Sequence, residues 1–146
     1  MVTVTSSAQP GTVTIEAEYE AFEAEAALML TSSEDVSDEL TFVTTAGAVY
    51  KVNVTAKNMA GFDGRFFSLT YDPAVLEIVD LCALTGSQTL TVGPVPRTGL
   101  TIESVSSGEI VFSFDKAVPG GKLWSGTINI FKFRALGSQS ATISIE

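Results

Sequence analysis

The clearest pattern in this sequence is a strict alternation of apolar and polar residues over short runs. In residues 48–56 the even-numbered positions are all apolar, and in residues 109–115 they are Ile or Phe. Successive side chains of a β-strand point to opposite faces, so a period of two predicts a strand with one buried face. Both runs therefore predict half-buried strands of an antiparallel sheet.

Further strands are predicted wherever β-branched and aromatic residues gather between Gly, Pro and Asp. These runs are residues 12–18, 40–45, 65–71, 75–80, 88–92, 100–105, 127–135 and 141–145. Residues 16–30 combine the high helix propensity of Ala and Glu with a strand-like alternation, and we interpret them as a strand. The polar residues 31–39 predict a loop.

The run 127–135 changes its phase part-way along. Ile128 and Ile130 share one face of an extended chain, whereas Phe131 and Phe133 share the other. Either both faces of this strand are covered, or a bulge shifts the register near Ile130. We favour a strand that is covered on both faces.

About nine to ten strands without a long helix predict an all-β fold. The expected architecture is a two-sheet antiparallel β-sandwich of jelly-roll type. The length of 146 residues suits one module over residues 1–146. Within it, residues 1–11 are expected to form a flexible leader, and the acidic residues 12–45 to pack on or extend the sandwich.

Composition excludes several classes of function. The chain has no His and a single Cys, Cys82, which removes Ser–His and Cys–His nucleophiles, His-ligated zinc and an intramolecular disulfide. Cys82 is expected to be a small buried hydrophobe. The net charge of −9 resides in residues 1–50, which hold nine acids and no base, so nucleic acid is not an expected partner. No apolar stretch reaches the roughly 18 residues of a membrane helix, so membrane insertion is not expected.

The run 67–81 reads Phe-Ser-Leu-Thr-Tyr-Asp-Pro-Ala-Val-Leu-Glu-Ile-Val-Asp-Leu. It resembles the cohesin domains, in which one strand ends at Tyr-Asp-Pro and a strand of the form Val-Leu-Glu-Ile-Val follows. Residues 47–54, 108–114 and 125–135 resemble other strands of that family, so the similarity covers roughly residues 46–146. The resemblance implies a jelly-roll sandwich, shared with bacterial carbohydrate-binding modules. It also implies an extracellular or cell-surface location within a larger secreted bacterial protein that handles plant polysaccharides.

Aromatic residues are the candidates for ligand binding, because flat rings stack on sugars and anchor partner proteins. We single out Trp124, Tyr19 and Phe131, although Trp124 could instead close one end of the core. One Trp and three Tyr are too few for the planar row that crystalline cellulose requires.

The carboxylates could serve catalysis or bind calcium. A glycosidase needs two facing acids, one with a raised pKa. No pair of acids stands out, and a run such as Glu16, Glu18 and Glu20 reads as a solvated strand face, so no catalytic residue is predicted. No cofactor is required, but a structural calcium ion with Asp35, Asp38 and Glu39 as oxygen ligands is a possible addition.

The sequence thus predicts a monomeric, non-catalytic extracellular recognition module resembling a cohesin. Its partner would be a dockerin-like protein or a polysaccharide. Two alternatives stay open: a carbohydrate-binding module for soluble glycan chains, and a structural spacer without a ligand.

Overall fold

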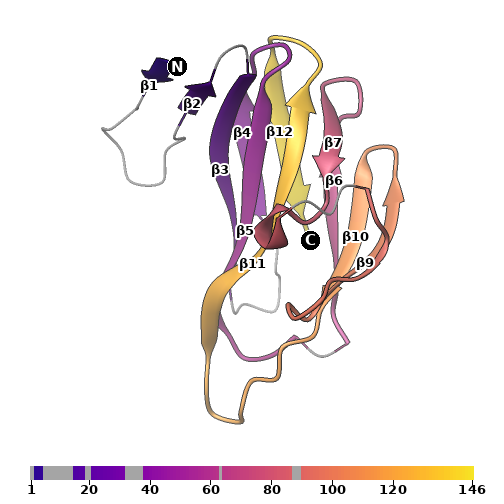
Figure 1. Cartoon of the computed structure of the whole chain (residues 1–146). Helices are drawn as coiled ribbons and strands as arrows, with labels where there is room; N and C mark the ends of the chain where they lie inside the picture. The colour runs from indigo at the N-terminus through magenta and orange to yellow at the C-terminus, as the bar shows by residue number, and fades with distance from the viewer. Residues whose placement is uncertain (1, 5–14, 19–20, 32–37, 63, 87–89) are drawn as a thin grey trace.

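The computed structural model describes residues 2–4, 15–18, 21–31, 38–62, 64–86 and 90–146. Two six-stranded sheets pack face to face as a β-sandwich (Figure 1). This confirms the all-β sandwich that the alternation of residues predicts. In the described residues, no helix is long and apolar enough to cross a membrane.

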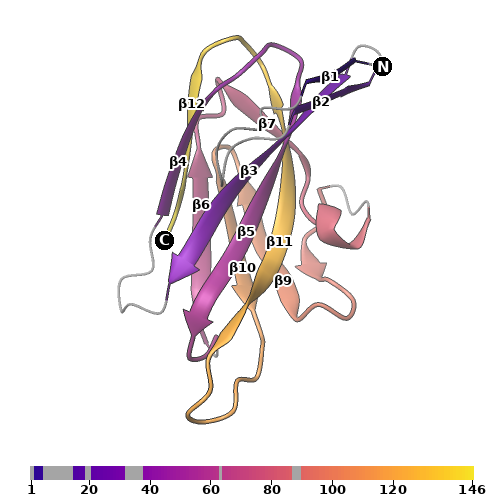
Figure 2. The same ribbon diagram turned by 90° about the vertical axis from the view of Figure 1, so that its left-hand side faces the viewer.

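Sheet A has the strand order β1-β2-β3-β5-β11-β7. The bounds of these strands are β1 (Val2–Val4), β2 (Ile15–Glu18), β3 (Ala21–Thr31), β5 (Val49–Met59), β11 (Trp124–Ala135) and β7 (Leu76–Asp80). Figure 2 shows β3, β5 and β11 side by side along the sheet. Residues 16–30 are extended, as interpreted, but they belong to two strands, β2 and β3, rather than one. β3 also pairs with β5 in parallel, which departs from the all-antiparallel expectation.

Sheet B has the strand order β4-β12-β6-β10-β9-β8, and all its pairings are antiparallel. Its strands are β4 (Asp38–Val43), β12 (Ser140–Ile145), β6 (Phe66–Tyr71), β10 (Glu109–Phe114), β9 (Leu100–Ser106) and β8 (Gly93–Pro94). The predicted strand 88–92 is wrong in its described part, residues 90–92. The short β8 follows it instead, in a Gly-Pro step expected to turn. A single 3-10 turn, η1 (Ala83–Thr85), follows β7.

The core lies between the sheets and is rich in aromatic rings from both. Phe112 of sheet B lies 5.5 Å from Phe131 of sheet A between ring centroids, and Tyr71 of sheet B lies 5.0 Å from Phe133. Aromatic pairs at such distances add to the free energy of burial. The inward residues of β5, β6, β10 and β12 follow the predicted period of two.

A bulge explains the phase change in β11. Thr127 lies opposite Thr55 and Asn129 opposite Val54, so Ile128 is an extra residue without a partner on β5. Ile128 and Asn129 are consecutive and both buried, and from there on the odd-numbered residues face the core. The favoured interpretation, a strand covered on both faces, is wrong. Ile130 is only half-buried, and its side chain is on the face of β11 that points away from the core. The bulge that we weighed against it is present at Ile128.

Candidate functional site

The three aromatic candidates have different positions. Phe131 is 0% exposed, so it belongs to the core and no ligand reaches it in the folded protein; the expectation that it binds a ligand is wrong. Trp124 is half-buried, with Phe62 and Phe114 each 5.5 Å from its ring centroid. It therefore closes one end of the core, the role weighed against ligand binding. Tyr19 lies outside the described residues.

The calcium candidates are only partly described. Asp35 lies outside the described residues. Asp38 accepts the N–H groups of Met29 (2.7 Å) and Glu39 (2.9 Å), one on each carboxylate oxygen. This bonding gives Asp38 a structural role, since it ties the end of sheet B to β3 of sheet A. Within the described ranges, no three acidic or cysteine side chains are grouped to hold a metal ion.

The strands of sheet B expose a broad surface, here called the sheet B face. It consists of the outward-pointing side chains of five strands, from the edge strand β4 across β12, β6 and β10 to β9. Most of them are short hydroxyl side chains. The face comprises Glu39, Thr41, Val43, Phe66, Ser68, Thr70, Thr101, Glu103, Ser104, Ser106, Glu109, Val111, Ser113, Ser140, Thr142 and Ser144.

The strands of sheet B carry acidic charges only, whereas those of sheet A carry charges of both signs. The six strands of sheet B contain no Lys or Arg, whereas β5 and β11 of sheet A carry Lys51, Lys57, Lys132 and Arg134. Glu39, Glu103 and Glu109 are the exposed acids of the sheet B face. A face that only meets solvent usually intersperses both signs of charge, and the sheet B face does not.

Hydrogen bonds hold two of these acids in place. Ser68 Oγ donates to Glu109 Oε1 at 2.6 Å, and Ser113 Oγ donates to Glu103 Oε1 at 2.7 Å. Short bonds to an ionised acceptor are the strong ones. Because the carboxylates are already positioned, less side-chain entropy is lost when a partner binds them.

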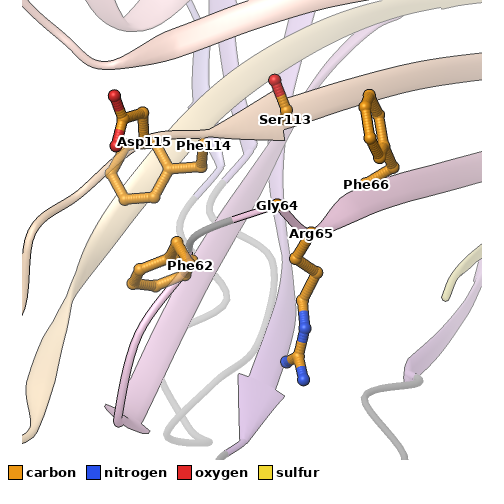
Figure 3. A pocket seen from close by; sticks show the side chains of 7 residues that line it. All are labelled: Phe62, Gly64, Arg65, Phe66, Ser113, Phe114 and Asp115. Carbon is orange, nitrogen blue, oxygen red and sulfur yellow. The ribbon is translucent and has the colours of Figure 1, made fainter.

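A hollow of about 300 Å³ lies at one end of the sheet B face and is here called the end pocket. Its wall is made by Phe62, Gly64, Arg65, Phe66, Ser113, Phe114 and Asp115 (Figure 3). Phe66 is 61% exposed, the most accessible aromatic side chain among the described residues. Ser113 lies directly opposite it on β10. The pocket and the sheet B face therefore share two residues and form one continuous surface.

Searches against protein-family models, curated proteins and solved structures found no match to this chain.

Two of the buried polar groups lie at the junction of β7 with β11. Asp80 is buried, and its Oδ1 accepts the N–H of Cys82 at 2.9 Å. Asn129, fully buried, donates from Nδ2 to the carbonyl oxygen of Leu81 at 2.6 Å. The Asn129 bond joins the end of β7 to the centre of sheet A. A third buried polar residue, Thr44, donates its hydroxyl to the carbonyl oxygens of Gly137 and Gln139.

Burial also explains the state of the single thiol. Desolvation raises the pKa of Cys82 above its ordinary value of 9.0, the hydrogen bond from Thr85 lowers it, and the carboxylate of Asp80 adds to the rise. The folded thiol therefore keeps its proton where an unfolded one ionises. A buried, protonated thiol is a poor nucleophile, which agrees with the small buried hydrophobe that the sequence predicts.

We expect the Cys82 thiol to resist Ellman's reagent in the folded protein and to react fully in urea. The free energy of unfolding should also fall as the pH rises above about 9, since only the unfolded thiol ionises there. Equilibrium denaturation at several pH values measures this, and Cys82→Ala should reduce the fall. Rapid labelling of the folded protein would contradict the burial of the thiol.

The sheet B face is the candidate functional surface that sequence reasoning missed. The sequence contained a signal for it. In the strands that form sheet B, the polar positions are Ser, Thr and acidic residues rather than Lys or Arg. What was missing was the pairing that places those positions side by side. Thr41 and Thr142, for example, are far apart in sequence, yet their hydroxyl oxygens lie 3.0 Å apart.

Proposed function

We propose that this chain is a non-catalytic recognition module that binds a protein partner through the sheet B face. The observation that supports this most directly is the face itself, whose strands carry acids but no Lys or Arg. Its Ser and Thr side chains lose little rotamer freedom when they are covered. Exposed Val43 and Phe66 add the apolar area that a protein interface buries. Charge of one sign also favours a partner with the opposite charge.

The aromatic side chains favour a protein over a glycan chain. A glycan-binding surface needs exposed rings on which sugars stack. Among the Trp, Tyr and Phe residues of the range 38–146 whose burial is described, only Phe66 is largely exposed. Tyr50 and Tyr71 are buried, and Trp124 packs in the aromatic cluster at the end of the core. A single ring supports one anchor point rather than a row.

Charge complementarity defines the chemistry of the partner. Three exposed carboxylates without a basic residue in the same strands attract a partner with a basic surface. Together with the resemblance of residues 46–146 to cohesins, this leads us to propose a dockerin-like protein as the partner. The setting would be a larger secreted or surface-attached bacterial protein that handles polysaccharides.

Val111→Arg tests the proposal at the centre of the face. Val111 is half-buried, with Ser68 opposite it on β6 and Ser104 on β9. An Arg here adds bulk and places a positive charge against a basic partner. We expect binding to weaken about 30-fold or more, the effect typical of a hot-spot residue. The measurement is biolayer interferometry against a panel of purified bacterial dockerin modules.

Thr127→Arg is the matched control, because Thr127 is an exposed residue of β11 on the opposite sheet. It carries the same added charge and should leave binding unchanged. If the wild-type chain binds no dockerin but binds components of a glycan array, the glycan alternative replaces this proposal. Silence in both assays would leave the structural spacer.

A further inference from the structure

The end pocket carries an inference that rests on the proposed function and makes it more specific. Three of its residues extend to the same side: Phe66, Ser113 and Asp115, while Phe62 and Arg65 lie on the other side (Figure 3). An open phenyl ring and a carboxylate therefore lie at the two ends of the pocket, with Ser113 between them (Figure 3). Ser113 links this group to Glu103 by its 2.7 Å hydrogen bond, so a second carboxylate adjoins it.

Asp115 is free to receive a cation. Its backbone N–H donates to the carbonyl oxygen of Gly99 at 2.7 Å, which fixes the chain while leaving the carboxylate exposed. Among the described residues, Asp115 takes part in no ion pair. The next residue, Lys116, places its Nζ 5.5 Å from the centroid of the Trp124 ring, so this cation already has an aromatic partner.

We propose that the end pocket receives an arginine side chain of the partner protein. A guanidinium group pairs with a carboxylate through two parallel hydrogen bonds, while the methylene groups of the same side chain cover apolar surface. Asp115 offers the carboxylate at one end of the pocket. Phe66 at the other end, with Phe62 and Phe114, offers apolar surface for the methylene groups. Arginine is also enriched among the anchor residues of protein interfaces.

The pocket also contains one basic residue, Arg65, which allows the charge of the occupant to be tested. Arg65 lines the far side, where its positive charge opposes an incoming guanidinium. Replacing it by Gln removes this repulsion. Binding of a cation should therefore become tighter in Arg65→Gln, whereas an anionic or purely apolar occupant would gain nothing from the change.

The probe is N-acetyl-arginine amide, titrated into the ¹⁵N-labelled chain at low salt and followed by amide chemical shifts. The matched probe is N-acetyl-citrulline amide, which has a similar shape without the charge. We expect shifts that centre on Phe66, Ser113 and Asp115 with the arginine probe only. Phe66→Ala should weaken binding about threefold, the effect of losing roughly one buried methylene contact. Asp115→Asn should weaken it at least as much.

Glu39→Gln, at the far edge of the sheet B face, is the control and should bind the probe like the wild type. An equal response to citrulline, shifts outside the pocket, or unchanged binding by Phe66→Ala and Asp115→Asn would each overturn the proposal. Dockerin binding that Val111→Arg abolishes and both pocket variants leave intact would overturn the pocket alone. Probe binding in the pocket with silence across the dockerin panel would overturn the protein-docking function alone.

Discussion

Phe131→Ala should lower the free energy of unfolding by about 3–5 kcal/mol, as expected when a fully buried aromatic side chain is truncated. The ring lies in the middle of β11 and packs against Phe112 of the opposite sheet with 5.5 Å between centroids. Removing it leaves a cavity between two sheets that are each fixed by their own hydrogen bonds, so the space cannot close fully. Urea denaturation followed by circular dichroism gives the loss directly.

Phe66→Ala is the matched control, because it deletes the same ring from an exposed position on β6. Exposed substitutions usually change stability by no more than about 0.5 kcal/mol. The two variants should therefore separate stability from recognition: Phe131→Ala unfolds more easily, whereas Phe66→Ala weakens binding of the arginine probe and of the partner with little change in stability. A near-neutral Phe131→Ala would show that this ring is not a core residue.

The different roles of these two rings show how far the sequence could predict the molecule. Periodicity predicted the strands and most of the core, because a period of two directly specifies which side chains share a face. It failed in β11, where one extra residue at Ile128 reverses the faces for the rest of the strand. A bulge depends on the pairing with β5, and the sequence of β11 alone left two readings open.

The candidate site was less predictable because its residues come together only through long-range pairing. The polar positions of β4 and β12 are visible in the sequence as Thr and Ser. They become neighbours only because β4 pairs with β12, a strand about 100 residues later in the chain. Asp38 illustrates the same limit. Its acidic surroundings in the sequence suggested a possible calcium ligand. In the fold, both of its carboxylate oxygens accept backbone N–H groups.

The parallel pairing of β3 with β5 has a related cause. The strand-like alternation in residues 16–30 predicted a strand but contained no information on its direction. A direction follows from the connection, and β3 belongs to sheet A whereas the next strand, β4, belongs to sheet B. The chain therefore changes sheets before it returns as β5, which allows β3 and β5 to run the same way.

Gly99→Ala is the substitution with the next largest expected effect, about 3 kcal/mol or more. Gly99 has a φ of +81°, a left-handed conformation that costs an L-residue about 1–2 kcal/mol. A Cβ at this position would also collide with the carbonyl oxygen of Asp115. To relieve the collision, the end of β10 must move away from the start of β9, which adds a cost of about 1–3 kcal/mol, as in overpacked cores. Thermal or urea unfolding measures the sum.

Gly121→Ala isolates the steric part of this prediction. Gly121 has nearly the same φ, +77°, but no neighbouring atom lies within 4 Å of the position that a Cβ atom would occupy there. It should therefore lose only about 1 kcal/mol from the backbone conformation. Because Gly99 accepts the hydrogen bond that fixes Asp115, Gly99→Ala should also weaken the arginine probe, whereas Gly121→Ala should not. Equal losses of stability in the two variants would mean that β9 and β10 separate at this end without cost, and that the end pocket lacks a rigid wall.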